Sequence, residues 1–332
     1  MDCEPEELQF LSLVGIFRES GKLIHSWRSL FARIAVSLVL PLSLLFLLHI
    51  QISYYLFSSI DSDDSALDRA APDSAAEHRI LQRLASDWMK LMIFKGVYLV
   101  ALLVLAMLST AAAVYSVASI YSAKELSFSR VLSVVPKVWR RLMATFVAAF
   151  ILLFGYNTLA ITVLVLVLLL LDGTAAAAPF AVLILFFYLA GLVYLSIVWH
   201  LASVVSVLEE SKGFDAMRKS RLLIKGKQWT TAGIFILLNI CFVGLEIGFR
   251  QLVVKGVGMS VAGRVFYGFI VSLLLCAFVL FALVVQTVVY FVCKSYHHES
   301  IDKSNLSDHL EVYLGEYVPL TAKDVQLEPF HV

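Results

Sequence analysis

The chain has 332 residues, of which 60% are hydrophobic and 15% are charged, and its formal net charge is +1. Its mean hydropathy is +0.87. This composition excludes an ordinary soluble domain and is typical of a protein that lies in a lipid bilayer.

Six apolar segments follow one another along the chain, and each is long enough for a membrane-spanning helix of about 20 residues. They are continuous runs, which excludes the alternating strands of a membrane β-barrel. We therefore predict an all-α fold, a polytopic membrane helix bundle with six transmembrane helices. The expected spans are residues 34–57, 91–120, 142–171, 180–208, 230–249 and 265–292.

Three parts of the chain are distinguished by these spans. Residues 1–33 form an N-terminal tail with an amphipathic helix, residues 34–292 form the membrane domain, and residues 293–332 form a C-terminal tail. Lys and Arg concentrate on one side of the expected bundle, with 18 residues against 8 on the other side. Because basic loops stay on the cytosolic side, we expect both termini in the cytosol. The endoplasmic reticulum, the Golgi and the plasma membrane all remain open.

Basic stretches with a Trp precede the first, third and fifth spans, at Trp27, Trp139 and Trp229. Short helices that mix Lys and Arg with apolar residues and Trp lie in the headgroup plane, so we predict cytosolic interfacial amphipathic helices. One interpretation is a helical-hairpin unit used three times; the positive-inside bias alone is the alternative. The basic residues expected at the membrane surface are Lys137, Arg140, Arg141, Arg218, Lys219, Arg221, Lys225 and Lys227.

The most polar internal stretch, "EESKGFDAMRKSRLLIKGKQW", carries nine charges between two apolar spans. Its pattern resembles a cytosolic loop found in polytopic proteins that include the membrane domain of bacterial glycerophosphodiester phosphodiesterases, and the acidic position falls on Glu209 or Glu210. The whole chain resembles a plant family of six-span membrane proteins. The resemblance implies a membrane fold and no active-site residue, because catalysis in the bacterial enzymes belongs to a separate soluble domain. The matching residues assigned to the motif are Glu210, Gly213, Ala216, Ser220, Leu223, Gly226 and Trp229.

Polar side chains inside the spans are costly and therefore informative. Glu246 has Arg250 one helical turn later, which predicts an ion pair, and Lys95 is an alternative partner. His49, Asn157 and His200 lie singly in other spans, where such residues form hydrogen bonds between helices more often than they bind ligands. A solute or proton pathway is the competing interpretation.

No catalytic or metal-binding motif stands out, so we expect no enzymatic activity, no cofactor and no metal. Expected partners are the lipid bilayer, its anionic headgroups, and membrane or cytosolic proteins, but not nucleic acid. The favoured function is a non-catalytic endomembrane or plasma-membrane protein that organises lipids or partner proteins through basic cytosolic helices. The alternatives are a small-solute transporter or channel, and an accessory or membrane-embedded protein of lipid metabolism.

Overall fold

The computed structural model describes residues 7–69, 74–122, 128–171, 177–256 and 258–297, and these parts of the chain contain helices and no strand. This confirms the predicted all-α fold. The elements are η1 (Glu7–Phe10), α1 (Leu13–Ser26), α2 (Arg28–Ile34), the π-helical η2 (Ala35–Val39), α3 (Leu40–Leu67), α4 (Ala75–Tyr121), α5 (Phe128–Leu170), α6 (Ala177–Leu208), α7 (Phe214–Ile224), α8 (Gln228–Phe249), the π-helical η3 (Arg250–Lys255) and α9 (Val261–Tyr296).

Six helical segments are long and apolar enough to cross a membrane, as the sequence predicts, and the chain is therefore a multi-pass membrane protein. Their bounds are wider than the predicted ones, because α3 and α4 continue past the membrane-sized stretch into polar sequence. The segments are Arg28–Leu67, Ala76–Tyr121, Val138–Leu170, Ala177–Leu208, Gln228–Lys255 and Val261–Tyr296.

Local sequence explains where several helices begin and change. Ser12, Ser74 and Ser260 each accept a hydrogen bond from the amide three residues later, at 3.1 to 3.4 Å, and so cap α1, α4 and α9. In the first span, η2 ends two residues before Pro41. A proline ring crowds the carbonyl four residues earlier in a regular helix, and the wider π-helical turn lies at that place.

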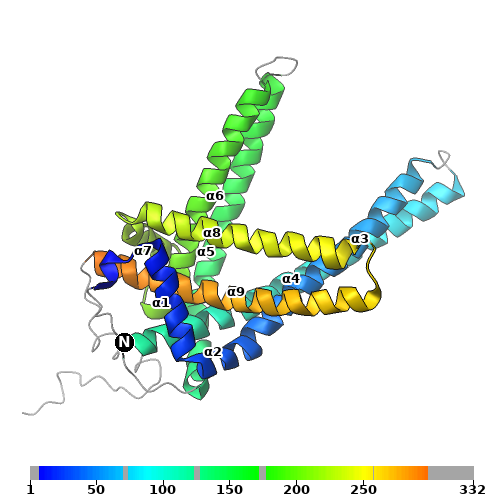
Figure 1. Cartoon of the computed structure of the whole chain (residues 1–332). Coiled ribbons are helices and arrows are strands. Elements are labelled where there is room, and N and C mark those ends of the chain that lie inside the picture. Colours follow the sequence, from blue (N-terminus) through cyan, green and yellow to red (C-terminus); the bar gives the residue numbers. More distant parts are fainter. Residues whose placement is uncertain (1–6, 70–73, 123–127, 172–176, 257, 298–332) are drawn as a thin grey trace, which may run out of the picture.

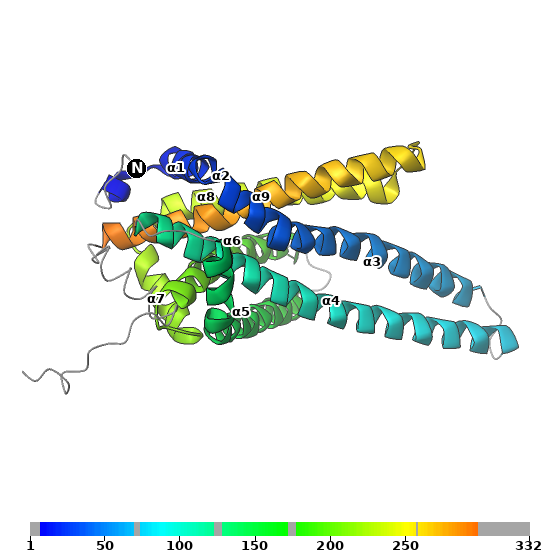
Figure 2. The ribbon, with the colours of Figure 1, turned by 90° about the horizontal axis from the view of Figure 1, so that it is seen from below.

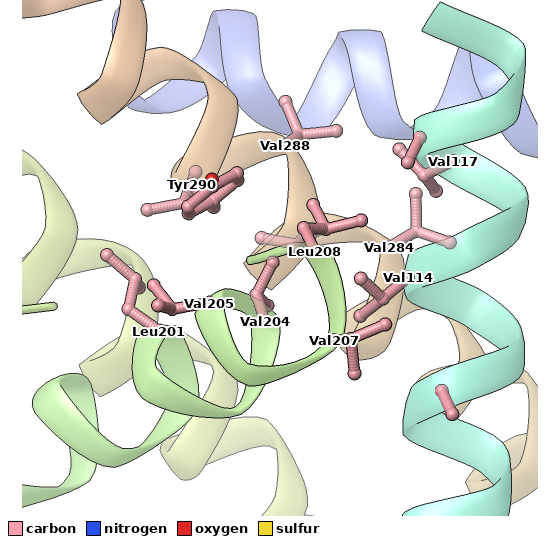
Figure 3. Close-up of a cluster of buried hydrophobic side chains, with 14 of the residues drawn as sticks. Val114, Val117, Leu201, Val204, Val205, Val207, Leu208, Val284, Val288 and Tyr290 are labelled. Carbon is pink, nitrogen blue, oxygen red and sulfur yellow. The ribbon is translucent and has the colours of Figure 1, made fainter. Parts of the chain in front are cut away.

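The helices form three hairpins that share one packed end, which we call the base (residues 7–39, 107–122, 128–149, 197–238 and 276–297). One hydrophobic core joins the base, with contributions from α1, α4 to α9 and the start of the first span. Figure 3 shows Val114 of α4, Val204 of α6 and Val284 of α9 facing one another within it. All three side chains are fully buried.

Beyond the base the hairpins continue as three arms: the first covers residues 40–106, the second 150–196 and the third 239–275. Figure 1 shows the second arm, built from α5 and α6, standing apart from the other two. In the second view the first and third arms run in a similar direction from the base (Figure 2). A small apolar cluster joins those two arms through Leu47, Ile50, Phe249, Val254, Val271 and Leu275.

Two short helices connect different hairpins at the base. Helix α1 precedes the first arm, yet it packs on α8 and α9, where Phe17 stacks on Phe281 with a centroid distance of 5.8 Å. Helix α7 precedes the third arm, yet it packs on α5 and α6 of the second hairpin. The basic stretch around Trp139 was expected to form a separate interfacial helix before the third span. It is instead the first part of the continuous helix α5.

Candidate functional site: the α7 segment and the polar groups of the arms

The carboxylate of Glu209 is the centre of a polar cluster at the base. It follows the last residue of α6 and accepts hydrogen bonds from the Tyr290 hydroxyl and the Lys219 ammonium, both at 2.6 Å. The Lys294 ammonium lies 3.5 Å away, and the backbone carbonyl of Glu209 accepts a bond from Arg141 at 3.3 Å. One residue therefore ties α5, α6, α7 and α9 together.

Charge balance in this cluster keeps Glu209 ionised. Burial alone would raise the pKa of the Glu209 carboxyl. The hydrogen bonds from Lys219 and Tyr290 and the charge of Lys294 outweigh that effect, so the pKa lies below its ordinary value. Glu209, not the exposed Glu210 assigned to the motif, makes these contacts.

The two motif glycines occupy backbone conformations that other residues rarely adopt. Gly213 has a φ of 60°, and its amide donates to the Thr145 hydroxyl at 2.9 Å. Gly226 has a φ of 91°, and a Cβ atom there would clash with the Tyr296 ring. Both positions therefore require glycine, one directly before helix α7 and one just after its end.

The inner face of α7 carries the other packed motif residues. Ala216 and Leu223 are buried in the base core, and the buried Ser220 hydroxyl donates to the carbonyl of Val198 at 2.8 Å. Trp229 differs from them, because its side chain is 93% exposed at the start of α8. The motif thus combines residues that pack α7 against the base with one exposed aromatic residue.

The outer face of α7 is basic and partly apolar. Arg218, Arg221 and Lys225 are exposed and make no ion pair with another residue in the described part of the chain. Phe214 and Leu222 lie on the same short helix and are about half exposed. Such a mixture of cations and apolar side chains suits the boundary between headgroups and acyl chains.

The remaining predicted basic residues have different environments. Lys219 is committed to Glu209, and the Lys227 ammonium lies 5.6 Å from the centroid of the Tyr296 ring. On α5, Arg140 is exposed beside the partly exposed Trp139, whereas Arg141 contacts Glu209. The side chain of Lys137 lies outside the described residues.

In the first arm, Lys95 pairs with His49. The Lys95 ammonium lies 2.7 Å from His49 Nε2 and donates to the Ser53 hydroxyl at 3.0 Å. Tyr98 stacks on the His49 ring with a centroid distance of 3.7 Å. These contacts link α3 to α4, so the alternative pairing of Lys95 with Glu246 does not occur in the structure.

Asn157 and His200 also bridge helices. The Tyr188 hydroxyl donates to the Asn157 side-chain oxygen at 2.7 Å, which joins α5 to α6 in the second arm. His200 Nδ1 lies 2.9 Å from the side-chain oxygen of Gln286, which joins α6 to α9 in the base. Both arrangements match the interhelical hydrogen bonding expected of isolated polar residues in spans.

Glu246 and Arg250 form the ion pair that their spacing predicts, with 2.7 Å between the nearest nitrogen and oxygen atoms. The Arg250 side chain is 52% exposed and the Glu246 side chain 26%. The pair lies where α8 passes into η3, at the far part of the third arm. Each of the four predicted intramembrane polar residues thus has a local partner. His49 and Glu246 lie in the first and third arms, which pack on each other, and are close enough for their charges to interact. Asn157 and His200 lie in the second arm and the base.

Sequence reasoning missed Tyr290 and Lys294 as members of the Glu209 cluster. Tyr290 is 1% exposed, and a buried tyrosine hydroxyl usually needs a partner, which is the signal that could have found it. No comparable signal separates Glu209 from Glu210, because every residue from Ile197 to Leu208 is buried or partly buried and no single buried face stands out. Among the residues covered by the structure, no group of three His, Cys, Asp or Glu side chains could hold a metal.

Comparison with known proteins gives one family. Residues 1–330 match the Domain of unknown function (DUF8558), and the chain belongs to this family. No curated protein and no solved structure matches the chain.

Proposed function

We propose that this member of the DUF8558 family is a non-catalytic membrane protein whose base faces the cytosol and engages anionic lipid headgroups through the outer face of α7. The observation that carries the proposal is that the two faces of the short helix α7 differ. Its inner face is fixed to the core, while Arg218, Arg221 and Lys225 project outward with the apolar Phe214 and Leu222. A rigid helix with this surface needs no further ordering to bind a membrane.

The proposed orientation follows from the basic residues that gather at the base. Each Lys or Arg near an anionic leaflet gains on the order of 1 kcal/mol. Residues 305–307, Asn-Leu-Ser, form a glycosylation acceptor within the C-terminal tail, outside the described residues. A glycan on Asn305 in the native membrane would place the base on the wrong side and contradict the proposal.

Two other functions remain as alternatives: a small-solute transporter or channel, and an accessory or membrane-embedded protein of lipid metabolism. The local pairing of His49, Asn157, His200 and Glu246 favours the lipid-organising role, because each polar side chain already has a structural partner. We further propose that the family is related to the membrane domain of bacterial glycerophosphodiester phosphodiesterases and to plant six-span proteins. The geometry of Gly213, Ala216, Ser220 and Gly226 supports that relation, since each residue type has a physical reason at its position.

Lipid crosslinking tests the proposal directly. A photoreactive amino acid at Phe214 reports contact with phosphatidylserine in vesicles of phosphatidylcholine and phosphatidylserine. Replacing Arg218, Arg221 and Lys225 together with Gln should lower this crosslinking at least about tenfold, because three attractive charges are lost. Lys219 is left intact, since it holds Glu209.

The matched control changes the same number of charges at the far end of the first arm. Arg69, Arg79 and Arg83 replaced with Gln should leave crosslinking from residue 214 unchanged. Raising the salt concentration should weaken the wild-type signal and have little effect on the triple α7 variant. Equal crosslinking in the wild type and the α7 variant would refute the proposed function.

A further inference from the structure

A hollow of about 340 Å³ lies between α7 and the end of α9. Its size falls within the usual range for small-ligand sites, about 300 to 1,000 Å³. It is distinct from the general basic surface of α7, because its lining also includes the acidic Asp215 and His297 at the end of α9. The lining residues are Asp215, Arg218, Lys219, Leu222, Leu223 and His297.

The cations of the hollow differ in how they are held. Lys219 is fixed by its 2.6 Å contact with Glu209, so its ammonium is already positioned at the wall. Arg218 is exposed and makes no hydrogen bond or ion pair with another described residue. A guanidinium with five unused donors binds phosphate in a two-point geometry.

Asp215 gives the hollow a second chemical preference. Its side chain is exposed, and it makes no hydrogen bond or ion pair with another residue that the structure describes. An ionised carboxylate only accepts hydrogen bonds, so it favours a ligand that carries hydroxyl or ammonium donors next to its phosphate. Asp215, Arg218 and Lys219 lie one helical turn apart on α7, so the acid and the two cations share one wall of the hollow.

The charge of the cluster distinguishes between the two kinds of donor. Arg218, Lys219 and Lys294 are balanced by Asp215 and Glu209, which leaves one positive charge. A phosphodiester headgroup with hydroxyls carries one negative charge and complements it, whereas a zwitterionic headgroup carries none. The ammonium of phosphatidylserine comes with a carboxylate, which the Asp215 carboxylate repels. Leu222 lines the hollow and is 51% exposed, which provides an apolar contact for the lipid beyond its headgroup.

We propose that this hollow binds the phosphodiester of a polyol headgroup, as in phosphatidylinositol or phosphatidylglycerol, with the phosphate on Arg218 and Lys219 and a hydroxyl on Asp215. The inference rests on the proposed function, because it requires the base to lie at the headgroup level. It adds selectivity: the outer face of α7 attracts any anionic lipid, while the hollow discriminates among them.

The test uses the full chain in phosphatidylcholine vesicles that contain equal amounts of photoactivatable phosphatidylinositol and phosphatidylserine. We expect the wild type to crosslink phosphatidylinositol at least about tenfold more than phosphatidylserine, the lower end of the range for one hydrogen bond to a charged group. Asp215→Asn should bring the ratio close to one while leaving phosphatidylserine crosslinking equal or higher, because a repulsive charge is removed.

Glu210→Gln is the matched control, since Glu210 is an exposed acid on the same segment outside the hollow. It should raise the crosslinking of both lipids slightly and preserve their ratio. If Asp215→Asn behaves like Glu210→Gln, or if the wild type shows no preference, the hollow is not selective and the inference is overturned. The proposed function survives that outcome, because it depends only on the triple α7 variant.

A soluble competitor separates a lipid headgroup from a free phosphate ester. Glycerophosphoinositol contains the same phosphodiester and hydroxyls without acyl chains. We expect it to displace phosphatidylinositol only at millimolar concentration, because it lacks the contact with Leu222 and the high local concentration of the bilayer. Displacement at micromolar concentration would identify a soluble ligand and overturn the lipid assignment.

Discussion

Helix α6 is apolar in both the base and the second arm, yet its surroundings in the two regions differ completely. In the base, α6 is buried without interruption from Leu201 to Leu208. In the second arm, none of the described residues between 150 and 196 is buried within the protein. The same helices α5 and α6 thus contribute one half to a protein core and expose the other half to lipid.

The difference follows from side-chain size. The buried half of α4 reads "STAAAVYSVAS" from Ser109 to Ser119, and these small residues let helices approach closely. The second arm reads "LAITVLVLVLLLL" from 159 to 171, with large aliphatic side chains on every face. A long apolar stretch of sequence can therefore form either a packed protein interior or a lipid-facing surface.

The largest effect should come from one leucine substitution made in both regions. Leu201→Ala in the base should lower the free energy of unfolding by about 3 kcal/mol, because a fully buried side chain leaves a cavity. Leu169→Ala, at a side chain that is 71% exposed, should cost less than about 0.5 kcal/mol. Unfolding in detergent micelles measures both; equal losses would mean that the second arm is packed against protein in its native state.

Removing the charge of Glu209 should have the next largest effect. Glu209→Gln keeps the shape but leaves Lys219 and Lys294 without their counter-ion, so we expect a loss of about 2 kcal/mol. Glu210→Gln should change stability by less than about 0.5 kcal/mol, as usual for an exposed site. A similar loss in both variants would show that the Glu209 cluster does not stabilise the base.

The acid stability of the same two variants gives an independent check. The pKa of Glu209 is lowered in the folded protein, so its contribution is present above the unfolded pKa of about 4.3 and is lost as pH falls through the folded pKa. The wild type should therefore lose stability below about pH 4 more steeply than Glu209→Gln. Glu210→Gln should follow the wild-type curve. Identical slopes for all three proteins would show that Glu209 does not cause the loss of stability in acid.

The sequence predicts much of the fold because the spans are local features. Six apolar runs, the α7 segment and the Glu246–Arg250 pair all depend on residues close together in the chain. The Glu209 cluster does not, since Tyr290 lies 81 residues further along. The fusion of the second basic stretch, around Trp139, into α5 was also missed, because nothing local separates an interfacial helix from the buried start of a longer one.

Glu246 offers the smallest expected effect and the sharpest test of how the arms function. Its partner Arg250 is half exposed, and an exposed pair at this helical spacing contributes only about 0.3 to 0.5 kcal/mol. Glu246→Gln should therefore change stability by no more than this amount. Arg250→Gln is the matched control, because it breaks the same pair from the other side.

The two variants distinguish a structural ion pair from a transport site in reconstituted vesicles. If the arms only hold the base in the membrane, the wild type carries no specific solute flux, and both variants resemble it. A proton or cation site would need the negative charge of Glu246 itself. A saturable flux that is abolished by Glu246→Gln and kept by Arg250→Gln would make the third arm a transport element and replace the lipid-organising role proposed for the base.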